Sequence, residues 1–312
     1  MVLQDRIKTS KELLLEFEEK HLNIRGEKLK FIGVQGKDVY NITAPFEDEG
    51  ELIIAGRVES RDSEISEVMF FKYENGSWVK RENTIILSLQ DPFVARINGE
   101  LVLGGVEIYP HLSSKNTLGY RTAFYRGATI NDLKKFTQGP EMMKDIRLVE
   151  VPDGKIAVFT RPQGEVGGRR EIGFIIINKI DELNAAIIKK ASLIQNQFND
   201  EEWGGANELH ILKNGLIGVL GHIASFDSIG NRHYYPMTFA FNIKTKEASA
   251  IKIIATRKNF PEGPYKRKDT IDVIFSGKII RKENDKAELY CGVSDAEACK
   301  ILIDDPFLEY EI

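Results

Sequence analysis

The sequence of 312 residues contains little cysteine, no long apolar run and no excess of one charge. Cys291 and Cys299 have no clustered His or further Cys near them, so they form neither a zinc pattern nor a disulfide framework, and we interpret both as buried thiols. No stretch approaches the roughly 20 apolar residues that a membrane-spanning helix needs, and the start, MVLQDRIKTSKELL, lacks the apolar core of a secretory signal. We therefore expect a cytoplasmic protein.

The charges are nearly balanced. Lys and Arg number 43 and Asp and Glu number 47, which gives a formal net charge of -4, and no basic block with interleaved aromatic residues suggests a nucleic-acid partner. With 42% hydrophobic and 29% charged residues, the composition is typical of a globular protein with a core. The carboxylates do not follow EF-hand spacing and the five His do not pair as i, i+4, so we predict no metal site.

Five segments of the chain are similar to one another. They are EGELIIAGRVE from Glu49, NGELVLGGVEI from Asn98, DGKIAVFTRPQ from Asp153, NGLIGVLGHIA from Asn214 and DKAELYCGVSD from Asp285. Each has a polar turn followed by a run rich in Val, Ile and Leu, which is typical of a hairpin turn leading into a strand. Their starts fall roughly 50 to 70 residues apart, enough for a four-stranded blade with one long loop. The sequence therefore predicts an all-β fold, a five-bladed β-propeller over residues 26–312.

Helical patterns are scarce. Residues 9–22 predict a helix with a capping box of Thr9 and Glu12 and an apolar stripe, so we expect residues 1–25 to form an N-terminal helical extension. A weaker pattern predicts a second helix over 181–194. The Asn-Gly pair in FFKYENGSWVKR, flanked by aromatic and β-branched residues, predicts a β-hairpin.

Charged side chains recur at the ends of the predicted strands. In a propeller the innermost strands of all blades meet at one central channel, so residues at matched positions converge there. Those at the mouths of the apolar runs are Arg57, Glu59, Asp91, Glu107, Arg161, His222 and Asp295. Such a ring suits a sugar or a phosphate, although charged residues at strand ends are also commonly just solvated.

Several blocks resemble a known enzyme family in their order. They are AGRVESRDSEIS (55–66), QDPFVARINGELVLGGVE (90–107), KDIRLVEVPDGKIAVFTRP (144–162), EEWGGANELHIL (201–212), GLIGVLGHIASFD (215–227) and DVIFSGKIIRKENDKAELYCGVSDAE (272–297). This order is similar to that of the five-bladed β-mannoside phosphorylases of glycoside hydrolase family 130, over about residues 30–305.

A second family is more similar still. DVYNITAPF (38–46) together with EWGGANELH (202–210) resembles the DUF1861 family, whose members include the mannosyltransferase/phosphorylases of glycosyltransferase family 108. Family 130 usually has EDPR where this chain has Gln90, Asp91, Pro92 and Phe93, so the arginine of that motif is missing. This departure favours the second family.

The resemblance implies reversible, inverting phosphorolysis of β-1,2-mannooligosaccharides to mannose 1-phosphate. Inorganic phosphate is then the co-substrate, GDP-mannose is an alternative donor, and no cofactor is required. Three rivals stay open: a GDP-mannose-dependent β-1,2-mannosyltransferase, a non-catalytic carbohydrate-binding propeller, and a β-mannoside hydrolase, which needs a second carboxylate from among Asp145, Asp269 and Asp272. The sequence leaves the oligomeric state open.

The resemblance also assigns site residues. Phosphate is itself the nucleophile, so one acid suffices to protonate the leaving oxygen, and Asp91 is that acid unless it only caps the turn before Pro92. Phosphate carries nearly two negative charges and favours cationic ligands, here Arg57, Lys144 and Arg161. His222 is also expected at the phosphate, as a neutral or a charged imidazole that could bind phosphate or a sugar hydroxyl. The arginines could instead bridge blades, and His222 could be a core residue. The expected sugar-binding residues are Tyr40, Asn41, Glu59, Asp145, Trp203, Asn207, Glu208 and His210.

Overall fold

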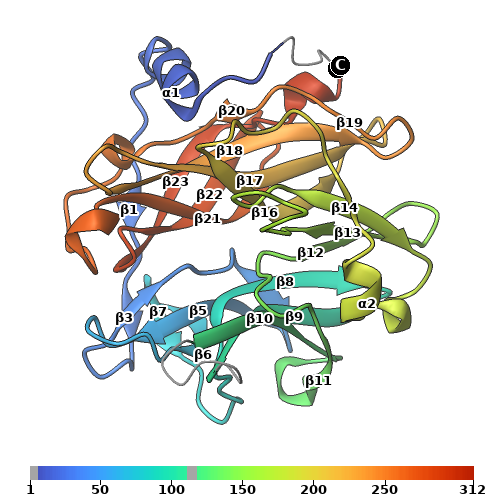
Figure 1. Ribbon diagram of the computed structural model, residues 1–312. Coiled ribbons are helices and arrows are strands. Elements are labelled where there is room, and N and C mark those ends of the chain that lie inside the picture. Colours follow the sequence, from blue (N-terminus) through green and yellow to red (C-terminus); the bar gives the residue numbers. More distant parts are fainter. Residues whose placement is uncertain (1–5, 111–117) are drawn as a thin grey trace.

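The protein is nearly all β. The computed structural model describes residues 6–110 and 118–312 (Figure 1). The helices within these residues are α1 (Ser10–Glu18), α2 (Ala185–Ile188) and the short 3-10 helices η1 (Ile130–Asp132), η2 (Ile180–Glu182), η3 (Arg257–Asn259), η4 (Lys268–Thr270) and η5 (Leu308–Tyr310). None of the helices in this part of the chain is long and apolar enough to cross a membrane.

Helix α1 carries the expected cap. The Thr9 side chain accepts from the backbone N–H of Glu12, and the Glu12 carboxylate accepts from the backbone N–H of Thr9. Its apolar stripe buries Leu13 and Phe17 in a core cluster with residues between Val151 and Ile253, and α1 packs against β17 (Ile217–Phe226) and β20 (Lys252–Ile253), beside which it lies in Figure 1. The helix ends at Glu18, one turn before the end of the pattern at Leu22.

The second predicted helix is wrong. Residues 181–194 instead contain the end of η2, the four-residue α2 and strand β15 (Ser192–Leu193). Asn184 interrupts the helical pattern, because its side-chain oxygen accepts from the backbone N–H groups of Ala186 and Ile187 and so starts a new helix. The segment that follows is extended because β15 pairs with β14 (Gly173–Ile177).

The strands form four hydrogen-bonded sheets. One contains β2 (Phe31–Ile32), β7 (Ser77–Lys80), β6 (Glu67–Glu74), β5 (Glu51–Glu59) and β3 (Asp38–Tyr40) in this order, with β4 (Phe46–Asp48) also on β5. The next contains β11 (Lys134–Gln138), β10 (Leu118–Gly127), β9 (Glu100–Pro110) and β8 (Gln90–Ile97). The third contains β12 (Arg147–Glu150), β13 (Ile156–Thr160), β14 (Gly173–Ile177) and β15.

The largest sheet has nine strands. Its order is β1 (Glu27–Lys28), β23 (Glu297–Asp304), β22 (Lys286–Val293), β21 (Asp272–Arg281), β18 (Arg232–Asn242), β17 (Ile217–Phe226) and β16 (Trp203–Ile211), with β19 (Glu247–Ala248) and β20 (Lys252–Ile253) on β18. Only two residue pairs join its halves, through the parallel contact of β18 with β21. Each half is otherwise antiparallel, and in the other sheets the one parallel pair among the described strands joins β2 to β7.

The five similar segments occupy equivalent places in these sheets. They form β5, β9, β13, β17 and β22, and each of these strands lies between two antiparallel partners. The predicted Asn-Gly hairpin is confirmed, since Glu74 pairs with Ser77 across Asn75 and Gly76. Successive strand groups pack against each other in chain order. The number of blades stays a prediction.

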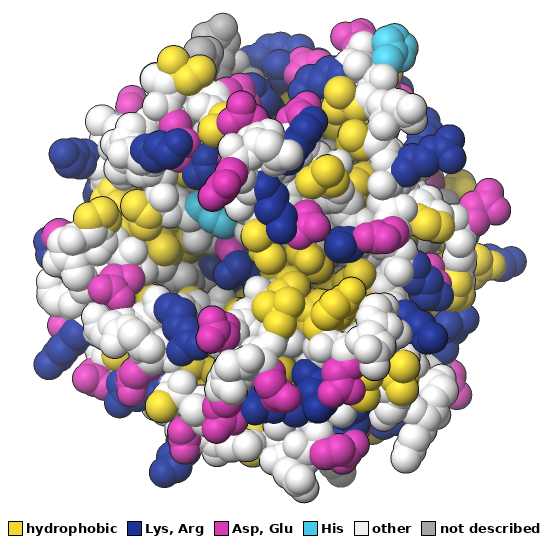
Figure 2. Space-filling view, turned by 180° about the vertical axis from the view of Figure 1, so that it is seen from behind, with side chains coloured by type: hydrophobic (Ala, Val, Ile, Leu, Met, Phe, Trp, Pro, Cys, Tyr) yellow, Lys and Arg dark blue, Asp and Glu magenta, His cyan; other side chains and the backbone are white. Residues whose placement is uncertain are grey.

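The first and last parts of the chain close this arrangement. β1 pairs with β23, with Glu27 opposite Lys300, and β3 packs against β22 and β23. Large side chains such as Phe70, Phe124 and Phe241 fill the interior, and both cysteines are buried and unbridged as predicted. Figure 2 shows basic and acidic side chains interspersed around a hydrophobic patch on one face, in keeping with the balanced composition.

Candidate active site

Irregular backbone at matching points of neighbouring strand groups places the polar side chains of the site. Asn41, Asp91 and Asp145 have positive φ angles of 45°, 50° and 57°, which Asn and Asp adopt more readily than most residues. β8 shifts register between Gln90 and Phe93 at this point. Such bulges turn a side chain out of the regular alternation of the sheet. As a result, all three side chains reach one cavity.

This cavity has a volume of about 500 Å³. It is lined by nine of the thirteen predicted site residues: Tyr40, Asn41, Arg57, Asp91, Lys144, Asp145, Arg161, Trp203 and His222. The other lining residues are Glu64, Gln90, Arg170, Phe226, Arg232, Tyr234, Lys266, Arg267, Val273, Phe275 and Asp295. The structure thus brings together residues from 40 to 295, far apart in the sequence.

Asp91 is held between a cation and an amide. Its Oδ1 accepts from Asn41 Nδ2 at 2.7 Å and from Arg57 Nη1 at 3.1 Å, and the side chain is only 5% exposed. Burial would raise the pKa of Asp91, but the charges of Arg57 and Lys144 outweigh it and lower the pKa overall. No backbone N–H of the described chain donates to this carboxylate, so turn capping is not what holds it there.

Glu59 lies behind the cavity instead of lining it, in contrast to the predicted sugar contact. Its carboxylate accepts from Arg57 Nη2 at 2.9 Å and also from Tyr40, Ser66 and Lys266. Burial opposes its charge, yet the surrounding cations lower the pKa of Glu59. Glu59 therefore fixes Arg57 from behind while Arg57 faces Asp91.

Arg161 and Asp145 form a buried ion pair. Their side chains are 2% and 1% exposed, and Arg161 also donates its Nε to the carbonyl of Gly204 at 2.9 Å. Burial opposes the charge of Asp145, but Arg161 and Lys144 hold its pKa well below the usual range. Much of the charge of Arg161 is therefore offset by Asp145.

Two cations of the lining have no carboxylate partner among the described residues. Lys144 has neither a hydrogen bond nor an ion pair there, and Arg170 donates only to the amide oxygen of Gln163, at 3.0 Å. Arg57, Arg161, Arg232, Lys266 and Arg267 each contact a carboxylate. Lys144 and Arg170 are thus the positive charges that an anionic ligand could engage without breaking an ion pair.

His222 and Asn207 are paired. His222 Nδ1 lies 2.8 Å from Asn207 Oδ1, and both side chains are buried. Burial and then the charge of Arg161 lower the pKa of His222 to about 3. His222 lines the cavity, whereas Asn207 lies behind it and reaches it only through the imidazole.

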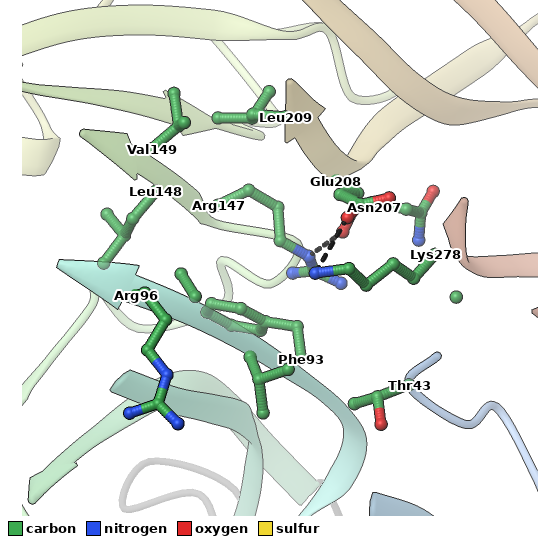
Figure 3. A pocket seen from close by; sticks show the side chains of 13 residues that line it. Thr43, Phe93, Arg96, Arg147, Leu148, Val149, Asn207, Glu208, Leu209 and Lys278 are labelled. Atoms are coloured by element: carbon green, nitrogen blue, oxygen red, sulfur yellow. Dashed lines mark hydrogen bonds and ion pairs between the residues drawn. The ribbon is translucent and has the colours of Figure 1, made fainter. Parts of the chain in front are cut away.

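Glu208 and His210, predicted as sugar ligands, do not line this cavity. Glu208 borders a second cavity of about 120 Å³ (Figure 3), where it pairs with Lys278 at 3.0 Å and with His210 at 2.8 Å. Both residues follow the bulge at Asn207 and lie further along β16. Glu107, expected in the charged ring, also lies outside the active-site cavity and pairs with Arg121 and Lys135.

An aromatic wall borders the active-site cavity. The Trp203 ring lies 4.8 Å from that of Phe226, and its indole N–H donates to the Tyr234 hydroxyl at 3.1 Å. Phe226 is 47% exposed, and the guanidinium carbon of Arg232 lies over its ring, 5.8 Å from the centroid. Trp203 therefore contributes to the wall while its own polar group is satisfied.

Several lining residues were not assigned a role from the sequence, although Asp295 was expected in the charged ring. Arg170 follows a glycine-rich stretch just after the Arg161-Pro162 pair, and Lys266 and Arg267 belong to the basic segment YKRK. Asp295, at one of the five matched positions, has no hydrogen bond or ion pair within the described chain. Burial raises the pKa of this carboxyl, although Arg57 opposes that rise. The described residues contain no cluster of three or more His, Cys, Asp or Glu suited to a metal ion.

The family described as protein of unknown function, DUF1861, matches residues 16–309. The chain belongs to the DUF1861 family. No curated protein matches it by sequence.

Among solved structures, this DUF1861 protein is similar to two enzymes of Leishmania mexicana. The mannose phosphorylase MPT-4, solved in complex with a phosphate ion, is 34% identical with a TM-score of 0.89, covering 97% of this chain and 95% of its own. The GDP-Man-dependent mannosyltransferase MPT-1 is also 34% identical with a TM-score of 0.88, covering 97% and 96%.

A more distant structure shares the fold alone. The β-1,2-mannobiose phosphorylase from Listeria innocua is 13% identical, with a TM-score of 0.65 over 93% of this chain and 99% of its own. The fold of this DUF1861 protein is thus of the propeller type.

Proposed function

We propose that this protein is a mannoside phosphorylase that transfers a mannosyl group, with inversion, between a β-1,2-mannooligosaccharide and inorganic phosphate. The observation that carries the proposal is one cavity holding the buried carboxylate Asp91 together with Lys144 and Arg170, which have no carboxylate partner in the described part of the chain. A phosphate needs such cations, and a glycosidic leaving group needs the carboxylate as a proton carrier. The 34% identity to a mannose phosphorylase solved with phosphate supports the same assignment.

The lowered pKa of Asp91 fits a proton relay. Hydrogen phosphate attacks the anomeric carbon, the bond to the leaving sugar oxygen breaks, and the proton of the phosphate ends on that oxygen. Written as HPO4²⁻ plus glycoside giving mannose 1-phosphate dianion plus free sugar, the reaction conserves atoms and charge. Asp91 then begins and ends each turnover ionised, as its position beside Arg57 favours. In the direction of synthesis the same carboxylate accepts the proton of the attacking hydroxyl.

The strand groups support five blades. Each of β5, β9, β13, β17 and β22 is the second strand of a group that begins at the cavity side, and the pairing of β1 with β23 joins the first and last groups. We infer that the nine-stranded sheet is two blades linked by the two-residue contact of β18 with β21. The active-site cavity then lies at one mouth of the central channel.

A sugar nucleotide is the second candidate substrate. Lys266, Arg267 and Arg232 line the cavity together with the partly exposed ring of Phe226, so the lining offers cations for a diphosphate and an aromatic side chain beside a base. The similarity to a GDP-Man-dependent mannosyltransferase supports this alternative. In either case the transferred group is mannosyl and the proton carrier is Asp91.

Hydrolysis depends on a different carboxylate from those expected. Asp145 is paired with Arg161, and Asp269 and Asp272 do not line the cavity. Asp295 is the lining carboxylate without a described partner, so an inverting hydrolase would use it to activate water.

The products separate these reactions. The purified protein is incubated with short β-1,2-mannooligosaccharides, with and without inorganic phosphate, and mannose 1-phosphate and free mannose are quantified. We expect mannose 1-phosphate that appears only with phosphate. Free mannose independent of phosphate, abolished by Asp295→Asn, would instead establish hydrolysis, and products formed only from GDP-mannose would establish the transferase.

Lys144→Met should weaken phosphate use selectively. The substitution keeps the aliphatic stem and removes a cation without an ion-pair partner, so we expect a KM for phosphate raised by about 10- to 100-fold. The KM for the mannoside and the melting temperature should change little. Lys155→Met, which removes an exposed cation paired with Asp153, is the matched control. Equal increases in both KM values would contradict a phosphate contact.

A further inference from the structure

The pairing of His222 with Asn207 defines what the imidazole can offer to a ligand. The ring lies on β17, is fully buried, and is packed between Tyr234 and Phe275 at centroid distances of 5.4 and 5.3 Å. Its Nδ1 is engaged by Asn207 Oδ1 at 2.8 Å. Its Nε2 has no hydrogen-bond partner in the described part of the chain, although His222 lines the active-site cavity.

An amide oxygen only accepts hydrogen bonds, so Nδ1 must carry the hydrogen in this contact. A neutral imidazole has one N–H, which leaves a lone pair on Nε2. Burial and the charges of Arg161, Lys144 and Arg147 disfavour a second proton, and Asp145, the one anion that opposes them, is itself neutralised by Arg161. His222 is therefore neutral at physiological pH.

The opposite amide orientation is electrostatically unfavourable. It would make Nε2 the N–H end of the ring and turn that positive end toward a cavity lined by Arg161 and Lys144. Arg161 lies near the Cε1 edge of the ring, since a Cβ built on Gly205 would meet both His222 Cε1 at 2.9 Å and Arg161 Cδ at 3.0 Å. A lone pair facing these cations is the favoured arrangement.

We infer that Asn207 is a positioning residue that fixes His222 with a lone pair on Nε2, so that His222 selects for a ligand oxygen that bears a hydrogen. That oxygen is a sugar hydroxyl or the hydroxyl of hydrogen phosphate. Of the neutral and charged forms that the sequence left open for His222, this selects the neutral one. The kinetic consequences rest on the proposed function, whereas the protonation of the imidazole does not.

Nitrogen NMR tests the protonation state on the ligand-free protein. The full chain is labelled with ¹⁵N-histidine, and the His222 signals are identified among the five His by their loss in His222→Phe. We expect a protonated Nδ1 and an unprotonated Nε2, both unchanged from about pH 5.5 to about pH 8.5. A protonated Nε2, or titration within that range, would overturn the inference whether or not the protein is a phosphorylase.

Asn207→Asp tests the positioning role. A carboxylate at the same place stabilises the imidazolium, so His222 should begin to titrate in the NMR experiment and should bind phosphate about ten-fold more tightly near pH 6 than the control does. Asn184→Asp adds the same charge at the start of α2, far from the cavity, and is the matched control. An unchanged ratio between the two variants, with His222 still neutral, would contradict the role of Asn207.

Two further experiments identify which ligand hydroxyl donates a hydrogen bond to His222 Nε2. If the hydroxyl of hydrogen phosphate meets Nε2, sulfate, which has no hydrogen at neutral pH, should compete at least about ten-fold more weakly than phosphate binds, and His222→Phe should raise only the KM for phosphate. If a sugar hydroxyl meets it, the same variant should raise only the KM for the mannoside. A variant that changes neither KM would overturn the contact.

Discussion

Asp91→Asn is expected to reduce turnover by about 10²- to 10⁴-fold while the protein still folds. The amide matches the shape of the carboxylate and can still accept from Asn41, but it cannot take up and return a proton. It also removes a negative charge beside Arg57 and Lys144, so phosphate should bind at least as tightly as before. A fall in turnover with intact phosphate binding is the signature of a proton carrier.

The measurement is turnover in both directions, with phosphate affinity by calorimetry and the melting temperature of the same samples. Asp305→Asn is the matched control, because Asp305 is also a buried aspartate paired with an arginine, Arg281, and it lies outside the active-site cavity. We expect the control to retain turnover. Loss of turnover in Asp91→Asn that is accompanied by a comparable loss of folded protein would contradict the catalytic role of Asp91.

The repeated segments explain why so much of the site could be predicted from the sequence. A polar turn followed by a β-branched run is a local signal, and the five such segments form equivalent strands. Asp91 and its counterparts Asn41 and Asp145 precede these strands by about ten residues, so matched positions converge in space. Convergence follows from repetition, and no distance information is needed to find it.

How far from the active-site cavity each residue lies along its strand could not be predicted in the same way. Residues that follow the irregular point of an inner strand lie further from the active-site mouth, which is why Arg147, after Asp145, and Glu208, after Asn207, border the second cavity (Figure 3). Strand alternation is altered at a bulge, and nothing in the local pattern marks where the bulge falls. The motif therefore predicted Glu208 and His210 in the active-site cavity, whereas both lie outside it, further along β16.

Ion pairing was equally hidden from the sequence. Arg57, Lys144 and Arg161 were all predicted as phosphate ligands. In the structure Arg57 is paired with Glu59, and Arg161 is paired with Asp145. Arg170 belongs to a loop, where no periodicity of the sequence indicates which way a side chain points. Which cation is free to bind an anion depends on side-chain contacts, near or distant in the chain, that no sequence pattern specifies.

Arg161→Ala is expected to destabilise the protein by about 3 to 5 kcal/mol, because it leaves the carboxylate of Asp145 buried without its partner. Urea unfolding measures this loss. Lys144→Met removes a cation from the same cavity without stranding a carboxylate and is the control, with an expected change below about 1 kcal/mol. Adding Asp145→Asn to Arg161→Ala should recover a large part of the lost stability, since the stranded charge is then gone. If Arg161→Ala is as stable as the control, Arg161 is not the structural partner of Asp145 and returns as a phosphate ligand.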